Sequence, residues 1–250
     1  MAVPAQRAYL DRFRELARRA AFRGEIAFTR FLEPAWEEDA RAVARETGAK
    51  AAFFGGHEDA ERRIAAFWSD VEPEDGEYPL ECLEARWSAK FSSPGHRDFL
   101  GALMGLGVVR ESLGDIAVLE GRALMIVHRD VAGFVRASLE SVGRASVRVE
   151  SFSGEMQWPA PAGETLTRTV AQLRLDAVLA AGYNLSREEA QAKIRSGLVK
   201  RNHQVELRGD FRLQEGDLLS VRGMGRLILQ NVGAQTKKGR IAIRLFRMGK

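Results

Sequence analysis

Three polar side chains near the carboxyl end are spaced so that they could follow a chain of phosphates. Arg187, Gln191 and Arg195 stand four residues apart, and residues at that spacing share one face of an α-helix, about one turn apart. Guanidinium and amide groups donate hydrogen bonds to phosphate oxygens without regard to base sequence. The spacing therefore predicts a row of donors suited to a nucleic-acid backbone, with exposed surface charge as the plain alternative.

Charge is distributed unevenly along the 250 residues, although the net charge is only +4. Residues 1–167 contain 21 Lys and Arg against 27 Asp and Glu, whereas residues 168–250 contain 17 against 7. An excess of ten positive charges in such a segment attracts polyanions, and nucleic acid is the commonest polyanion in a cell. A surface that serves solubility alone is the other interpretation.

Patterns that would indicate catalysis are weak. The histidines at 57, 96, 128 and 203 are scattered, and Cys82 is the single cysteine, with no base beside it. One cysteine can form neither an intrachain disulfide nor a multi-cysteine metal site, so we expect a buried thiol in a strand. No phosphate-binding loop of the Gly-x-x-x-x-Gly-Lys-Ser/Thr type occurs. We therefore expect no catalytic residue, no cofactor and no metal site.

The composition is that of a folded globular protein, with 45% hydrophobic and 29% charged residues. No apolar run approaches the 18 or so residues that a spanning helix needs. The first 23 residues mix acids among arginines and lack the apolar core of a secretory signal. We expect a monomer in the cytoplasm without a membrane partner.

The elements expected in the first two thirds of the chain indicate a mixed α/β (α+β) class. A small N-terminal α/β unit, residues 1–75, is expected to contain helices over 9–23 and 34–47, a strand over 49–54 and a helix over 58–68, followed by a linker over 71–79. Pro34 suits the start of the second helix and Gly48 its end.

Residues 76–152 show a clearer rhythm of strands and helices. Strands are expected at 80–87, 115–119, 122–128 and 145–151, with helices at 96–106 and 131–139, in the β-α-β-β-α-β order of ferredoxin-like and RRM-like domains. Many RNA-binding domains of this plan stack bases on aromatic residues of the central strands. The strand over residues 123–127 contains no aromatic residue. A plain scaffold and an RNA platform therefore both remain open.

A second linker over residues 151–167 is expected to lead to a basic module at 168–250. A helix over 173–181 precedes Gly182, which could end it. Ser186 and Glu189 have the spacing of a capping box, so a second helix is expected to begin there and to end at Gly197. Short strands at 205–207 and 218–221 complete a plan of two helices followed by a small antiparallel sheet.

This module resembles the RNA-binding domain named after ribosomal small-subunit protein four, the S4 domain. The resemblance covers about residues 171–230 and is carried by RLDAVL at 174–179, SREEA at 186–190, IRSGLV at 194–199, Asn202 and EGD at 215–217. In that family the arginines of the two helices and the basic turn after them contact structured RNA. The resemblance implies this role for Arg174, Arg187, Gln191, Lys200, Arg201 and Asn202, while Arg195 follows from the helical row alone. Arg201 and His203 stand where the family usually has Val and Gly.

Two further stretches narrow the match to the YlmH family of bacterial S4-domain proteins. They are residues 96–116 and the tail at 225–240, where Arg226, Lys237, Lys238 and Arg240 add candidate RNA contacts. The resemblance implies a non-catalytic protein that binds ribosomal RNA and peptidyl-tRNA on the large ribosomal subunit, in ribosome-associated quality control. Because S4 domains also occur on pseudouridine synthases and methyltransferases, an RNA-modifying enzyme is one alternative. A protein-interaction adaptor in cell division is another.

Overall fold

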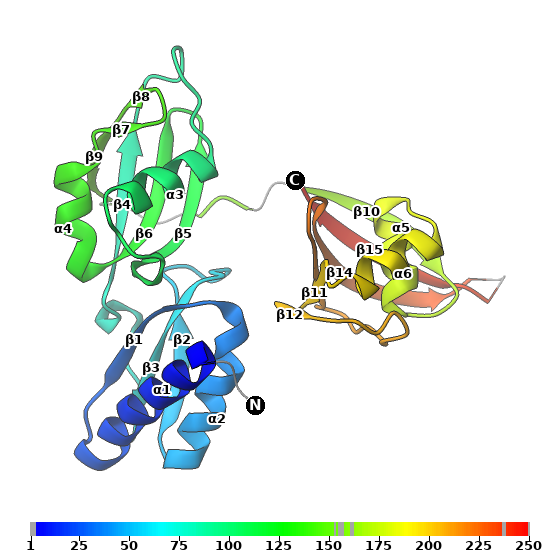
Figure 1. Ribbon diagram of the computed structural model, residues 1–250, viewed down its shortest axis with the longest axis horizontal. Helices are drawn as coiled ribbons and strands as arrows, with labels where there is room; N and C mark the ends of the chain where they lie inside the picture. Colours follow the sequence, from blue (N-terminus) through cyan, green and yellow to red (C-terminus); the bar gives the residue numbers. More distant parts are fainter. Residues whose placement is uncertain (1–3, 153, 155–157, 161–162, 237–238, 250) are drawn as a thin grey trace. The chain divides into compact units, whose positions relative to one another are not determined.

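The computed structural model describes residues 4–152, 154, 158–160, 163–236 and 239–249, and it has the expected mixed α/β class. The chain divides into two compact units, residues 1–159 and 160–250 (Figure 1). The further division of the first unit near residue 75 stays a prediction. Within the described part of the chain, no helix has both the length and the apolar content needed to cross a membrane.

The N-terminal part of the first unit is a three-stranded antiparallel sheet with two helices on one face. The helices are α1 (Pro4–Arg23) and α2 (Glu37–Thr47), the latter preceded by the short 3-10 helix η1 (Pro34–Trp36). The helices expected over 9–23 and 34–47 are thus confirmed, and Gly48 ends α2 with a φ of 78°. The strands β1 (Ala27–Leu32), β2 (Lys50–Phe54) and β3 (Arg63–Trp68) lie in the order β1-β3-β2.

The helix expected over residues 58–68 is wrong, because residues 63–68 form the central strand β3. Its side chains enter two separate cores on alternate sides, Ala65 and Phe67 under the helices and Ile64, Ala66 and Trp68 on the opposite face. A strand that is buried on both faces shows no alternation of polar and apolar residues, so its sequence reads like a buried helix.

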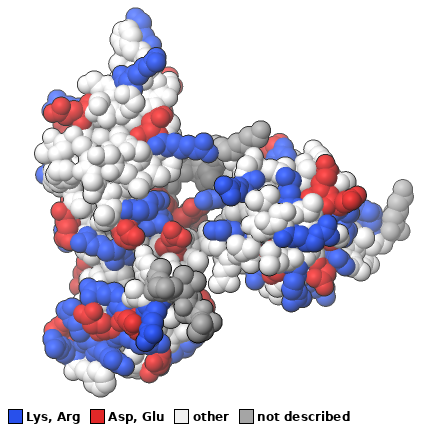
Figure 2. Space-filling view, viewed as in Figure 1, with Lys and Arg blue, Asp and Glu red and all other residues white. Residues whose placement is uncertain are grey.

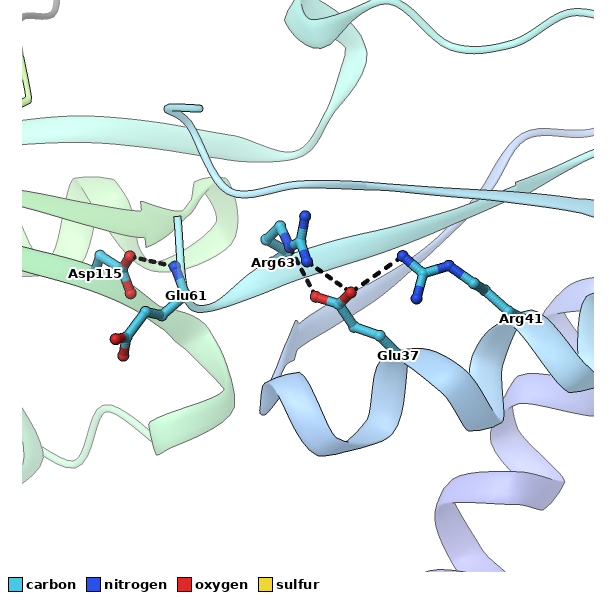
Figure 3. A network of polar contacts seen from close by, with 5 residues as sticks. All are labelled: Glu37, Arg41, Glu61, Arg63 and Asp115. Carbon is cyan, nitrogen blue, oxygen red and sulfur yellow. Dashed lines mark hydrogen bonds and ion pairs between the residues drawn. The ribbon is translucent and has the colours of Figure 1, made fainter. Parts of the chain in front are cut away.

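Polar contacts fix the start of this strand (Figure 3). Arg63 donates to both carboxylate oxygens of the buried Glu37 on α2, each at 2.7 Å, and Arg41 donates to Glu37 at 3.2 Å. Just before the strand, the backbone N–H of Glu61 donates to the carboxylate of Asp115 at 2.7 Å. The loop before β3 is thereby tied to a strand of the next sheet.

The second sheet has the expected β-α-β-β-α-β order. Its strands β4 (Leu80–Arg86), β5 (Leu113–Leu119), β6 (Arg122–His128) and β9 (Arg148–Ser151) lie in the order β5-β6-β4-β9, all antiparallel. The helices α3 (His96–Gly105) and α4 (Arg129–Ser138) share a core with one face of the sheet. The last strand is shorter than expected because residues 145–146 pair instead in a hairpin of β7 (Ser141–Val142) and β8 (Ala145–Ser146). Short 3-10 helices, η2 (Asp75–Glu77) and η3 (Arg110–Ser112), precede β4 and β5.

The two sheets of the first unit pack face to face. Phe31, Ile64 and Trp68 of the first sheet share a core with Cys82 and Ile126 of the second. The approach is close, because a Cβ on Gly114 would lie 2.8 Å from the ring of Phe31. The thiol of Cys82 is buried in a strand as expected, and burial raises its pKa to about 12.

The second unit is a six-stranded antiparallel sheet with two helices. Its strands lie in the order β10-β15-β14-β13-β11-β12, and the helices are α5 (Leu175–Tyr183) and α6 (Arg187–Arg195). The strands are β10 (Gly163–Val170), β11 (Val199–Arg201), β12 (Gln204–Val205), β13 (Leu218–Val221), β14 (Gly225–Gln235) and β15 (Ile241–Met248). The linker expected up to residue 167 is therefore wrong from residue 163 onward. All eight residues of β10 pair with β15, which lies about seventy residues later in the sequence. No local sequence pattern could therefore predict this strand.

The first helix of this unit runs past the glycine that was expected to end it. Helix α5 ends at Tyr183 and is capped by Asn184, which adopts the left-handed conformation with a φ of 53°. Gly182 lies inside the helix, where a Cβ would come within 2.4 Å of Leu227 on β14. The glycine is thus needed for close packing of helix and sheet rather than for a turn.

Candidate RNA interface

Asp176, in the first turn of α5, is the centre of the candidate interface. Its side chain is fully buried, yet three of the residues expected to bind RNA converge on it. Arg174 donates to both of its oxygens at 3.0 and 3.2 Å, Gln191 donates at 3.1 Å, and the Arg187 guanidinium lies 2.7 Å away. One carboxylate therefore joins the connection before α5 to two successive turns of α6.

The protonation of Asp176 follows from competing effects. Burial by itself raises the pKa of this carboxyl group, whereas the hydrogen bonds from Arg174, Gln191 and Arg187 lower it. The hydrogen bonds prevail, and the pKa of Asp176 lies below its ordinary value. Asp176 is therefore ionised at neutral pH and holds both guanidinium groups in place.

The expected capping box fixes where α6 begins. The Ser186 hydroxyl accepts from the Glu189 N–H at 3.1 Å, and the Glu189 carboxylate accepts from the Ser186 N–H at 2.7 Å. Arg187 is consequently the first residue of α6 and faces Asp176 across the helix pair. The local sequence thus sets the position of a cation that the tertiary contact then orients.

A groove of about 470 Å³ runs beside this cluster. Arg174, Gln191 and Arg195 line it from the helix side, and Arg208 lines it from the loop before β13. The expected row on α6 is therefore split, since Gln191 and Arg195 line the groove and Arg187 does not, although Gln191 and Arg187 both contact Asp176. Arg208 was not anticipated from the sequence.

The basic turn after α6 is a two-residue hairpin loop between β11 and β12. Its central residues, Asn202 and His203, have φ values of 45° and 70°, the left-handed pair that a type I′ turn requires. Asn202 donates to Asp217 at 2.7 Å and accepts from the Leu218 N–H at 2.9 Å. Both ends of its side-chain amide are engaged within the protein, so Asn202 fixes the turn against β13.

A second buried carboxylate orients Arg201. Asp217 is 6% exposed and accepts from the Arg201 guanidinium at 3.0 Å. That guanidinium also lies 4.3 Å from the ring centroid of Phe211, and Arg208 lies 5.8 Å from the same ring. An aromatic residue flanked by arginines is the sequence signal that could have pointed to Arg208.

The remaining predicted residues are more dispersed. Lys200 is exposed on β11, and Arg226 on β14 is half-buried, with a pKa lowered by burial. Arg240 donates to the side chain of Thr169 at 3.0 Å and to its carbonyl at 2.6 Å, so its guanidinium joins β10 to the β14–β15 hairpin. Lys237 and Lys238 lie outside the described residues.

The acidic groups leave part of the N–H donors of this cluster available to a ligand. A guanidinium carries five N–H donors, and a carboxylate can engage only part of them. The side chain of Arg187 remains 50% exposed beside Asp176, and that of Arg174 remains 35% exposed. Figure 2 shows basic and acidic side chains interspersed over the visible face of the second unit. The geometry suits recognition by oriented hydrogen bonds more than a uniform positive field.

The described residues hold no group of three or more His, Cys, Asp or Glu side chains that could bind a metal ion.

Comparisons with known proteins agree with this picture. A family model described as a putative RNA-binding domain in YlmH matches residues 73–155, and the S4 domain model matches residues 173–219. The chain is 37% identical over 235 residues to the ribosome-associated protein quality control protein P2 of Bacillus subtilis (strain 168), covering 93% of this chain and 91% of that protein.

A solved structure is also similar. The cell division protein ylmH from Streptococcus pneumoniae gives a TM-score of 0.52 at 24% identity, covering 61% of this chain and 94% of that one. At that identity the likeness concerns the fold.

Proposed function

Because the chain belongs to the YlmH family of S4-domain RNA-binding proteins, we propose that it docks on structured RNA of the large ribosomal subunit and has no catalytic activity. The RNA is ribosomal RNA, with peptidyl-tRNA as a second contact. The protein acts in ribosome-associated quality control, as a monomer in the cytoplasm.

The observation that carries this proposal is the cluster at Asp176. Arg174 before α5, and Arg187 and Gln191 on α6, are held by one buried carboxylate and stay partly exposed. Side chains that are fixed in advance lose little entropy on binding, so they suit a rigid, folded partner such as ribosomal RNA. The name of the Bacillus subtilis relative supports the ribosome as the place of action.

Sedimentation of a cell extract tests the docking target. With antibody detection, the protein is expected in the fractions that contain large subunits, and it should leave them when ribosomal RNA is digested. Peptidyl-tRNA contact is tested by comparing purified large subunits with and without bound peptidyl-tRNA, which should bind the protein with different affinities. Recovery only in fractions free of ribosomal particles would contradict the proposal.

The two alternatives give different results. An RNA-modifying enzyme would change labelled RNA chemically when small cofactors are supplied, whereas the proposed binder leaves the RNA intact. A cell-division adaptor would keep its protein partners after nuclease treatment, whereas the proposed binder loses them.

A further inference from the structure

The second sheet is built like an RNA-binding platform, but its middle is covered. In domains of this plan, bases stack on the sheet face that is opposite to the helices. Here Cys82, Leu124 and Ile126 on that face are buried against β1 and β3 of the first sheet. The face that would read bases in a related architecture is therefore closed by the protein itself.

One end of this face stays open and carries three arginines in a row. Arg86, the last residue of β4, pairs across the sheet with Arg122 on β6 and with Arg148 on β9. Their side chains are 68%, 48% and 84% exposed. Leu83 and Ala85 face the helices. Because side chains alternate along a strand, the three arginines point to the other face of the sheet. The three arginines therefore lie on the same face of the sheet as Cys82, Leu124 and Ile126, at the end of the strands where the first sheet no longer buries that face.

Like charges directly opposite one another destabilise a pair of strands. Glu84, which is 8% exposed, offsets part of this cost, because its carboxylate lies 2.9 Å from Arg86 and 3.6 Å from Arg122. Glu150 pairs with Arg148 at the exposed edge. Neighbouring strands are about 4.8 Å apart, so the row spans about 10 Å and presents more N–H donors than these carboxylates can use.

An exposed aromatic side chain stands at the same end of the sheet. The connection from β4 to α3 projects beyond the strands (Figure 1) and carries Phe91, which is 81% exposed. The connection is braced, since the Trp87 ring N–H donates to the Ser92 carbonyl at 3.1 Å and the Phe91 N–H donates to the Ser88 carbonyl at 3.2 Å. Lys90 lies 5.6 Å from the Phe91 ring centroid.

We infer that Arg86, Arg122 and Arg148 together with Lys90 and Phe91 form a second RNA contact, separate from the cluster at Asp176. The guanidinium groups bind the phosphates of one strand, and an unpaired base stacks on Phe91. Cations beside an exposed aromatic ring match the alternation of phosphate and base in a single strand. The inference rests on the proposed RNA-binding function and adds a single-stranded segment to the RNA that the protein recognises.

The test uses the full chain and labelled total ribosomal RNA in filter binding over a series of salt concentrations. The variant Arg86→Ala/Arg122→Ala/Arg148→Ala is compared with Arg18→Ala/Arg23→Ala/Arg45→Ala, which removes the same charge from exposed helical positions of the same unit. The sheet variant is expected to bind about tenfold more weakly, with a salt slope lower by about 2. Equal affinities and slopes for the two variants would overturn the inference.

A single substitution tests the same contact in case the triple variant fails to fold. Phe91→Ala is compared with Phe22→Ala, because both rings are 81% exposed. Loss of one stacked base is expected to weaken binding at least about fivefold for Phe91→Ala only. A photoreactive benzophenone amino acid at position 91 should form adducts with RNA, and adducts with protein alone would overturn the inference. Failure of the unmodified protein to bind RNA would instead contradict the proposed function.

Discussion

Arg187 on α6 and Asp176 on α5 lie 2.7 Å apart, which makes a buried carboxylate the anchor of a cation on the outer surface. The same carboxylate engages Arg174 and Gln191. The pair joins the two helices of the S4 module into one platform. Asp176 therefore has two opposing effects on the platform: its charge offsets part of the positive charge, and its hydrogen bonds hold Arg174, Arg187 and Gln191 in place.

Replacing Asp176 by Asn separates these two roles. The change makes the protein more positive, so charge alone predicts tighter RNA binding. Loss of the anchor predicts weaker binding and a free energy of unfolding that is lower by about 2–3 kcal/mol, because hydrogen bonds to a charged group are lost in a buried site. Filter binding and urea unfolding measure both. Tighter binding by Asp176→Asn would contradict a positioning role.

The stability contribution of Asp176 depends on pH with a definite sign. Its folded-state pKa is lowered, so the contribution is complete above the ordinary value near 4 and is lost as the pH falls through the folded-state pKa. The difference in unfolding free energy between the unmodified protein and Asp176→Asn should stay constant from about pH 7 to pH 5 and shrink below about pH 4. A difference that grows toward acid would refute this assignment.

His203 occupies a left-handed position in the β11–β12 turn, with a φ of 70°. Glycine adopts this conformation without steric cost, so His203→Gly should raise the free energy of unfolding by about 1 kcal/mol. Thermal unfolding of this variant measures the gain, and His203→Ala serves as a control that gains nothing. A loss of stability in the glycine variant would show that contacts of the histidine outweigh its backbone strain.

Strand β10 makes the boundary of the second unit testable. A fragment that starts at residue 160 keeps the full pairing of β10 with β15, whereas one that starts at residue 168 loses five of the eight paired residues. We expect the longer fragment to unfold cooperatively and the shorter one to be less stable by several kcal/mol or unfolded, as circular dichroism during heating would show. Equal stability would mean that β10 is dispensable.

Local signals in the sequence predicted those elements that local interactions determine. The Ser186 and Glu189 capping box and the left-handed Gly48 are set by neighbours within one turn of helix. The β-α-β-β-α-β order was also readable, because its helices and strands differ in period. Strands β1, β3 and β10 were missed because their pairing partners are distant or because both faces are buried.

The candidate site was predicted in its members but not in its arrangement. The family pattern pointed to Arg174, Arg187 and Gln191, yet nothing in the sequence showed that they meet at Asp176. That residue reads as an ordinary acid in the first turn of a helix. Its role becomes visible only when α5 and α6 are packed together. The role of Asp217 beneath Arg201 likewise becomes visible only when β11 pairs with β13.

The central claim is that cations of the two-helix platform and of the adjoining strand β11 bind RNA, and the salt dependence of binding tests it most directly. The slope of log affinity against log salt is to be measured for the unmodified protein, for Arg187→Ala/Lys200→Ala (the platform variant), and for the control Arg222→Ala/Arg244→Ala, which removes one exposed arginine from the β13–β14 turn and one from β15. The platform variant should lose about 1–3 kcal/mol of binding free energy and about 1.5 units of slope, while the control keeps both. An unchanged slope and affinity in the platform variant would contradict the account.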